Sequence, residues 1–214
     1  MTQLAQSSDI VTLGDLLERL GGIPADRVRF YPLPGTATEE DVVAIEAREN
    51  HLCELVDGVL VEKPMGYRES FVAMLLATSL NNFVLRRKLG AVTGADGMIR
   101  LFPGLVRIPD VAFVSRQRLP GGRVPSEPIP HLVPDLAVEV LSLTNTEAEM
   151  ARKRREYFEA GVRLVWLIDP QARSAAVFTG PEQSTTLGED GVLDGGEVLP
   201  GFAIPLRDLL TGLD

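Results

Sequence analysis

Two acidic residues, Asp110 and Glu139, stand in segments that otherwise have the pattern of buried strands. In the segment PDLAVEVLS, residues 134–142, apolar side chains occupy both sets of alternating positions, which is typical of a strand covered on two faces. Glu139 lies on the side of Ala137 and Leu141. An ionised carboxylate is costly to bury, so Glu139 needs a cation, hydrogen-bond donors or a raised pKa.

A second carboxylate can approach Glu139 only from another strand. Asp135 lies on the same strand, four residues earlier, which is roughly 13 Å along an extended chain and too far to share one metal ion. Asp110 begins the apolar segment RIPDVAFVS, on the side shared with Ala112 and Val114. Because it belongs to a different strand, Asp110 is the better partner for Glu139.

A lysine on the next helix completes a chemically recognisable set. Lys153 follows Met150 by three residues and precedes Tyr157 by four, so it falls on the helix face that should point to the core. Oxygen ligands on adjacent strands suit Mg²⁺ or Mn²⁺, and a lysine beside such an ion can position or help to deprotonate a water. This combination is typical of phosphodiester hydrolysis.

Structural explanations are open for each of these residues. Glu139 could form a buried ion pair with Lys153, and Asp110 taken alone could cap a turn at the start of a strand. Lys153 could instead bury only its stem and extend its ammonium outward. Tyr157 could support Lys153, although core packing is the favoured interpretation.

The remaining patterns predict the elements that would position these side chains. A short helix is predicted after Thr12, and longer helices at 38–50, 66–90 and 146–160. The helix at 66–90 is expected to be amphipathic, with Phe71, Leu75, Thr78 and Asn82 on roughly one face, and to stop at Gly90. A hairpin turning at Asp57-Gly58 is expected within 53–63. Further strands are predicted at 91–95, 97–102, 107–115, 134–142 and 163–170, with a surface loop at 116–134 and short antiparallel strands after Arg173.

Strands that bracket helices in this order predict an α/β (α+β) protein with a mixed β-sheet flanked by helices. We expect one domain over residues 1–214. It would comprise an N-terminal helical extension (1–50), a core (54–170) and a β-rich C-terminal tail (171–214).

Composition limits the possible partners and locations. The net charge of −9 argues mildly against simple electrostatic binding of nucleic acid, but basic clusters at 86–88 and 152–155 could contact phosphates locally. No apolar run is long enough to cross a membrane, and no secretory signal is expected. The single cysteine, Cys53, excludes an internal disulfide and fits a cytoplasmic location.

An ordered series of motifs resembles the Uma-two family of restriction-endonuclease-like proteins, which have the PD-(D/E)XK nuclease fold. The series comprises ELVDGVLVEKPMG at 54–66, PD at 109–110, EVLS at 139–142, Lys153 with Tyr157, and GVRLVWLIDP at 161–170. Each motif alone is weak, whereas their order and spacing are fairly specific.

The resemblance implies roles for particular residues. Asp110 and Glu139 would bind the metal ion with help from the Val140 carbonyl, and Glu54 would be a further acidic member of the site. Lys153 would be the catalytic lysine. The implied restriction-endonuclease-like core is a mixed β-sheet flanked by helices.

The chain departs from the simplest motif at three positions. Leu141 stands two residues after Glu139, where that motif has its lysine, so the lysine role passes to the following helix. Leu143 replaces a proline usual in the family, and Glu149 replaces an aspartate. None of these changes removes a proposed catalytic group.

These observations predict a Mg²⁺-dependent endodeoxyribonuclease, with Mn²⁺ as a possible substitute and no organic cofactor. DNA is the expected partner, although RNA or branched DNA would fit the same chemistry, and a homodimer could cut both strands of a duplex. The alternative is a catalytically inactive nuclease-fold protein that acts as an interaction module for protein or DNA, because fold does not guarantee activity.

Overall fold

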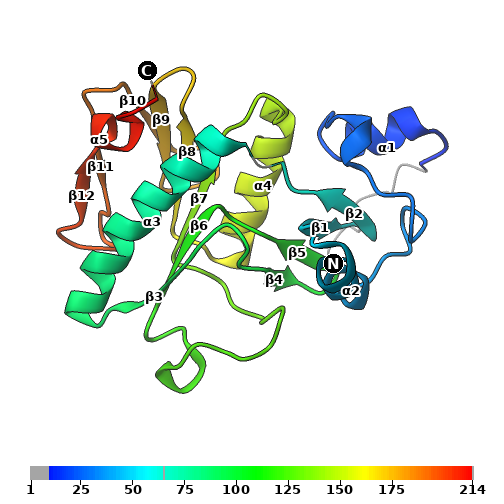
Figure 1. The fold of residues 1–214 in the computed structure, drawn as a ribbon, viewed down its shortest axis with the longest axis horizontal. Helices are drawn as coiled ribbons and strands as arrows, with labels where there is room; N and C mark the ends of the chain where they lie inside the picture. Colours follow the sequence, from blue (N-terminus) through cyan, green and yellow to red (C-terminus); the bar gives the residue numbers. More distant parts are fainter. Residues whose placement is uncertain (1–9, 65, 214) are drawn as a thin grey trace, which may run out of the picture.

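The computed structural model describes residues 10–64 and 66–213, and its chain forms two main sheets with helices packed around them (Figure 1). Residues 1–9 of the expected N-terminal extension and Met65 of the KPMG motif lie outside the described residues.

A six-stranded sheet with the order β10-β9-β8-β7-β6-β3 forms the larger layer. Its strands pair antiparallel, except that β7 and β8 are parallel. Their connection is therefore a crossover, which runs through α4. The bounds are β3 (Gly90–Thr93), β6 (Val111–Ser115), β7 (Leu136–Val140), β8 (Leu164–Asp169), β9 (Ser174–Phe178), β10 (Ser184–Leu187) and α4 (Glu147–Ala160).

Helices cover both faces of this sheet. α3 (Tyr67–Arg87) packs on the face that carries Leu136 and Val138 of β7, and its buried residues share a core with Trp166. α4 lies on the opposite face, where its Tyr157 packs with Ala137. All five residues of β7 are buried, which confirms the prediction of a strand covered on two faces. Glu139 therefore faces α4.

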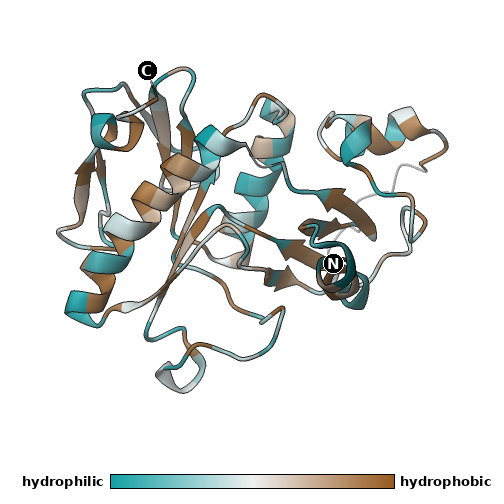
Figure 2. Cartoon of the chain, viewed as in Figure 1, coloured by the Kyte–Doolittle hydropathy of each residue, from teal (hydrophilic) through white to brown (hydrophobic). Residues whose placement is uncertain are grey.

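The smaller sheet has the order β2-β1-β5-β4 and lies beside α4 (Figure 1). Its strands are β1 (Cys53–Val56), β2 (Val59–Glu62), β4 (Ile99–Phe102) and β5 (Leu105–Arg107). The predicted hairpin is confirmed, because β1 and β2 turn at Asp57 and Gly58, both with positive φ. Figure 2 shows mostly hydrophobic strands in this sheet and a largely hydrophilic α4, so α4 brings charged side chains to the interior.

Shorter elements close the two ends of the fold. α2 (Glu39–Glu49) confirms the predicted second helix and packs its Val42 and Ile45 in a core with β1. The other elements are α1 (Leu13–Arg19), η1 (Ala25–Arg27), η2 (Pro120–Gly122), β11 (Val192–Asp194), β12 (Ala203–Pro205) and α5 (Leu206–Leu210). The short strands expected after Arg173 are confirmed.

The prediction of one strand over 107–115 is wrong. The segment divides at Ile108–Asp110, where the chain leaves β5 in the smaller sheet and enters β6 in the larger one. Pro109 stands at this point and has no N–H to continue a ladder of hydrogen bonds. The sequence pattern stays apolar across the junction because the connecting Ile108 is itself fully buried.

The expected end of α3 is also wrong, and the face that carries Phe71 and Thr78 is not its buried face. Its buried residues are Val72, Ala73, Leu76, Leu80 and Val84, whereas Phe71 and Thr78 are exposed. The helix ends at Arg87, and Lys88 adopts the left-handed conformation at its C-cap with φ 56°. Gly90 belongs instead to β3, where Ala91 to Thr93 also pair with β6.

The segment 116–134 is a surface loop that is attached to the core at several points. Leu119 and Leu132 are buried against Val114, and Ile129 joins the core of the smaller sheet. Among the helices of the described ranges, none is long and apolar enough to span a membrane.

The two sides of α3 give a direct test of its orientation. Leu76 is fully buried and Met74 is 65% exposed. We expect Leu76→Ala to lower the free energy of unfolding by about 2–5 kcal/mol, because it leaves a core cavity. Met74→Ala, the matched control on the same helix, should change it by less than about 0.5 kcal/mol. Urea denaturation measures both values, and equal losses would contradict this orientation.

Candidate active site

Asp110 and Glu139 lie side by side at the junction of β6 and β7. The antiparallel register pairs Val111 with Val138, which places Asp110 opposite Glu139. The Asp110 backbone N–H donates to the Val138 carbonyl at 2.9 Å, and the Val140 N–H donates to Asp110 Oδ2 at 2.7 Å. The two carboxylates that the sequence singled out therefore belong to one buried site.

Asp135 is held away from this site. Its Oδ2 accepts a hydrogen bond from the Ser115 N–H at 2.7 Å, and its Oδ1 lies 3.2 Å from Arg118 Nε. These contacts belong to the opposite end of β7, and they give Asp135 a structural role in joining β6 to β7.

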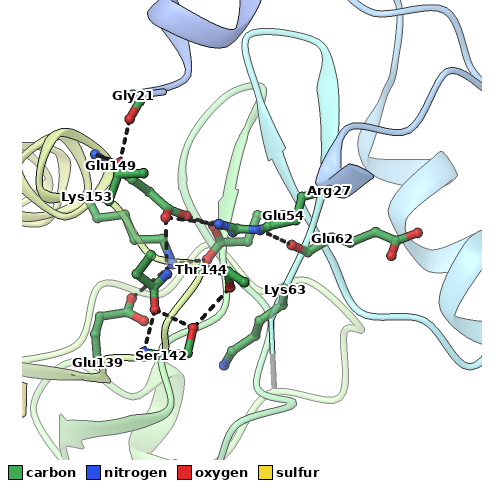
Figure 3. Close-up of polar contacts among 12 residues, drawn as sticks. Gly21, Arg27, Glu54, Glu62, Lys63, Glu139, Ser142, Thr144, Glu149 and Lys153 are labelled. Atoms are coloured by element: carbon green, nitrogen blue, oxygen red, sulfur yellow. Dashed lines mark hydrogen bonds and ion pairs between the residues drawn. The ribbon is translucent and has the colours of Figure 1, made fainter. Parts of the chain in front are cut away.

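Lys153 extends from α4 between two carboxylates (Figure 3). Its Nζ lies 2.9 Å from Glu54 Oε1 and 3.4 Å from Glu139 Oε1, and the residue is 2% exposed. The outward-extending alternative is therefore wrong. Tyr157 is fully buried as favoured, and its hydroxyl also donates to Glu139 Oε1 at 2.6 Å.

Glu54 reaches the site from the smaller sheet. Besides Lys153, its carboxylate accepts from Arg107 Nη1 at 2.7 Å and from the Ile108 N–H at 3.1 Å. Burial alone would raise the pKa of Glu54, but the charges of Lys153 and Arg107 lower that pKa to about 2. Glu54 is thus an ionised, fully partnered anchor.

The carboxylates around Lys153 stabilise its charged form. Burial by itself would lower the pKa of its ammonium, yet the Glu139 and Glu54 carboxylates outweigh burial and raise that pKa above its ordinary value. The group therefore keeps its proton at neutral pH. It can donate hydrogen bonds and offset negative charge, but it does not accept a proton.

Of the two carboxylates that contact Lys153, Glu139 has fewer neighbouring groups that offset its negative charge. Burial raises its pKa, Lys153 opposes the effect, and repulsion from Asp110 and Glu54 adds to it. Its contact with Lys153 is the longer of the two that the lysine makes. An additional cation beside Glu139 and Asp110 would relieve this unfavourable charge.

Lys63 is a member of the site that sequence reasoning missed. Its Nζ lies 2.8 Å from Asp110 Oδ1 and donates to the carbonyls of Ile108 at 2.7 Å and Ala95 at 3.1 Å. The side chain is 3% exposed. In the alternating pattern that continues from β2, Lys63 falls on the same side as the buried Val59 and Val61. This position was a signal in the sequence that Lys63 points inward.

Two buried arginines were also missed. Arg107 joins Glu54 to Glu156 of α4, and its guanidinium is 4% exposed. Arg27 of η1 donates to both oxygens of Glu149 at 3.0 and 2.7 Å. Glu149, the residue that departs from the family pattern, thereby fastens the N-terminal segment to α4.

The basic cluster expected at 152–155 is not one phosphate-binding surface. Arg152 contacts Asp57 at 3.0 Å and Glu156 at 2.7 Å, and Lys153 points into the interior. Arg154 and Arg155 lie further around the helix, and Arg155 is exposed. The side chains thus point in separate directions around α4, as its 3.6-residue period requires.

The site's oxygen donors fit a Mg²⁺-type cation. Within the described ranges no group of three or more His, Cys, Asp or Glu side chains is arranged as a metal cage. Mg²⁺ normally uses one or two carboxylates and completes its shell with water and phosphate oxygens, so Asp110 and Glu139 suffice. The Val140 N–H points to Asp110, and the carbonyl of the same strand residue points to the same side.

Comparison with known proteins identifies the class and then the family. A solved structure described as a "putative nuclease belonging to DUF820 from Anabaena variabilis" superposes with a TM-score of 0.66 and 18% sequence identity. The match covers 74% of this chain and 89% of that chain, and it confirms the predicted mixed α/β fold.

The family model described as "Uma2: Putative restriction endonuclease" matches residues 39–207, and the chain belongs to this family. The resemblance found in the sequence is thereby confirmed, and nuclease family membership implies a nucleic-acid substrate. The comparison with curated proteins found no match.

The opposite pKa shifts of Glu54 and Glu139 predict opposite effects of their neutralisation. Glu54→Gln should lower the free energy of unfolding at pH 8 by about 3–5 kcal/mol, because it leaves buried cations unpaired. Glu139→Gln should leave the metal-free protein as stable as wild type or more so, because it removes a costly buried charge. Urea denaturation in EDTA measures both effects.

The pH dependence of the free energy of unfolding is the control for the Glu54 and Glu139 variants. A raised Glu139 pKa means that wild-type stability falls as pH rises from the ordinary glutamate value through the raised one, and Glu139→Gln should remove that slope. The stability that Glu54 contributes is present above its ordinary pKa and is lost as pH falls towards about 2. Equal losses in both variants at pH 8 would show that the two carboxylates are equivalent anchors.

The Lys63–Asp110 pair predicts strong coupling in a double-mutant cycle. Lys63→Met should lower the free energy of unfolding by about 3–5 kcal/mol, because it leaves a buried carboxylate without its cation. Adding Asp110→Asn should restore part of that loss, with an interaction energy of about 1–3 kcal/mol. Urea denaturation of wild type, the two single variants and the double variant at pH 8 gives the interaction energy. Additive losses would show that Lys63 and Asp110 do not interact.

Proposed function

We propose that this protein is a Mg²⁺- or Mn²⁺-dependent endonuclease that hydrolyses phosphodiester bonds in DNA. The observation that carries the proposal is the opposite placement of Asp110 and Glu139 on neighbouring strands, with the buried ammonium of Lys153 beside them. Two carboxylates and a cation in one buried site on a nuclease fold suit phosphate chemistry better than a purely structural ion pair.

Asp110 and Glu139 would hold the divalent ion, with the Val140 carbonyl as a further oxygen ligand. The bound ion would lower the pKa of a coordinated water and neutralise charge that develops on the phosphate. Val140 and Lys63 each hold one oxygen of Asp110, which fixes the orientation of this carboxylate. Tyr157 holds Glu139 in the same way.

Lys153 would orient the attacking water and offset charge on the phosphate. Because its carboxylate neighbours keep it protonated, its contribution is that of a fixed hydrogen-bond donor and cation. Glu54 holds the lysine in place and acts as a positioning residue. The attacking water would lose its proton to solvent or to the substrate phosphate.

The alternative is an inactive member of the fold that binds a protein or DNA partner. All four residues of the proposed site are present, and they lie in close contact: Glu54, Asp110, Glu139 and Lys153. An inactive member of a nuclease fold often lacks one of its catalytic groups, so their presence favours the enzyme. A second copy of the chain would provide the second cut in a duplex. The single cysteine, buried in the core, is compatible with a cytoplasmic location.

The test combines metal binding with cleavage. Calorimetry with MnCl₂ and nicking of supercoiled plasmid should both succeed with wild type. Asp110→Asn and Glu139→Gln should weaken metal binding and reduce the nicking rate by about 100-fold or more, a loss of roughly 2.7 kcal/mol of transition-state stabilisation. These substitutions keep side-chain size, so circular dichroism should show folded proteins.

Glu159→Gln is the matched control, because Glu159 is an exposed acid on α4 away from the carboxylate pair. It should bind metal and nick plasmid as wild type does. Nicking that persists equally in all variants would reveal a contaminating nuclease. Metal binding without any nicking, across duplex and single-stranded substrates, would favour the inactive alternative.

A further inference from the structure

A cavity of about 540 Å³ opens beside the carboxylate site, at the carboxyl ends of β7 and β8 and the first turns of α4. Its walls include Leu141, Met150, Leu167 and Phe178, and its polar lining includes Ser142 and Arg154. Ligands of α/β proteins commonly bind at the carboxyl ends of parallel strands. The volume lies within the range typical of sites for small organic groups.

Arg154 lines this cavity and has one N–H donor without a partner among the described residues. Its Nε is shielded from solvent and has no hydrogen-bond partner in the part of the chain that the structure describes. The guanidinium carbon lies 4.5 Å from the centroid of the Phe178 ring, which holds the group in place. Its Nη2 makes long contacts of 3.3 and 3.4 Å to Glu182, a side chain that is 76% exposed. The position of the Arg154 side chain is therefore fixed, but not all of its N–H donors have a good hydrogen-bond acceptor.

The charged side chains that line the cavity favour some anionic ligands over others. Arg68 adds a second cation, whereas the acids Glu69, Glu147 and Asp169 also border the cavity. Asp169 is engaged by the N–H groups of residues 171 and 172. A densely charged ligand such as a triphosphate would be repelled by these acids, while a singly charged phosphodiester with an attached base would match both the arginines and the apolar walls.

The cavity and the carboxylate site are neighbours along two elements. Leu141 and Ser142 directly follow Glu139 and Val140 at the end of β7. On α4, Met150 and Arg154 flank Lys153 in the sequence, so the helix borders both places. A nucleic-acid strand with one phosphate at Asp110 and Glu139 can therefore extend its next nucleotide into the cavity.

We propose that this cavity is the subsite for one nucleotide adjacent to the scissile phosphate, with Arg154 donating to its phosphodiester and the apolar wall contacting its base. The proposal rests on the proposed nuclease function. It gives Arg154 a role in substrate binding that is separate from metal binding, because Arg154 is outside the carboxylate pair.

The test measures binding without cleavage. A fluorescein-labelled 12-nucleotide single strand is titrated with protein in EDTA, and fluorescence polarisation gives the Kd. Arg154→Met keeps the apolar stem over Phe178 and should weaken binding about tenfold, as expected for loss of a hydrogen bond to a charged group. Arg155→Met, which removes the same charge from the exposed neighbouring position, should change the Kd less than about twofold.

A second variant tests the cavity without changing charge. Ala151 lines the cavity, so Ala151→Leu should fill part of it and also weaken binding, while circular dichroism and Tm establish folding. In ¹⁵N spectra, the Arg154 Nε–H signal should shift when the 12-nucleotide single strand is added to wild type. Equal weakening by Arg154→Met and Arg155→Met, or an unmoved Nε–H signal, would overturn the subsite.

Cleavage assays separate failure of the subsite from failure of the proposed function. If wild type nicks plasmid but Arg154→Met and Ala151→Leu bind the strand normally, the subsite is wrong and the nuclease stands. If wild type neither binds the strand nor nicks plasmid with Mn²⁺, both proposals are overturned. Weakened binding with Mn²⁺ affinity unchanged in Arg154→Met supports the subsite.

Discussion

The buried ammonium of Lys153 is the interaction on which the rest of the site depends. It contacts Glu54 of the smaller sheet and Glu139 of the larger sheet, while its own backbone belongs to α4. Three separate parts of the fold therefore meet at one charge. Charged groups buried in this way are tolerated only when their partners are in place, so Lys153 and Glu54 require each other. The position of α4 relative to both sheets is constrained by this requirement.

The chain crossing between the sheets is fixed by the same kind of contact. Arg107 and the Ile108 N–H bind Glu54 on one side of the crossing, and Lys63 binds the Ile108 carbonyl and Asp110 on the other. Asp110 comes directly after Pro109 and immediately before β6 pairs with β7. Its placement opposite Glu139 thus follows from ion pairs on both sides of a short connection as well as from strand register. A displacement of the smaller sheet would move Asp110 and with it the carboxylate pair.

The sequence predicted those parts of the site whose burial appears in a local pattern. Alternating apolar residues identified β7 and the side on which Glu139 lies, and helical spacing placed Lys153 inward. The burial of Lys63, Arg107 and Arg27 was not predicted, because their partners lie 32 to 122 residues away in the chain. A basic residue at the end of a strand or short helix normally faces water, and only the tertiary contact changes this.

The buried face of α3 could not be predicted for a different reason, since apolar residues occur on more than one side of that helix. Tyr67, Met74 and Leu85 are more than half exposed, so the helical period alone allowed two orientations. The junction at Ile108–Asp110 was missed because a buried crossing keeps the composition of a strand. In both places the local pattern was real, and packing against a distant element decided between its interpretations.

Glu54 and Glu139 belong to one buried cluster but differ in how well their charges are offset. Both are buried and both contact Lys153, yet the pKa of Glu54 is lowered to about 2 whereas that of Glu139 is raised. The difference arises because Glu54 has Arg107 and a backbone N–H in addition to the lysine, while Glu139 has Tyr157 and the repulsion of Asp110. Glu54 has a full set of hydrogen-bond and ion-pair partners and fixes the position of Lys153. Glu139 has an incomplete set, so a bound cation could interact with its carboxylate. Residues that violate a folding rule without full compensation tend to mark functional positions, and within this cluster Glu139 is the residue that does so.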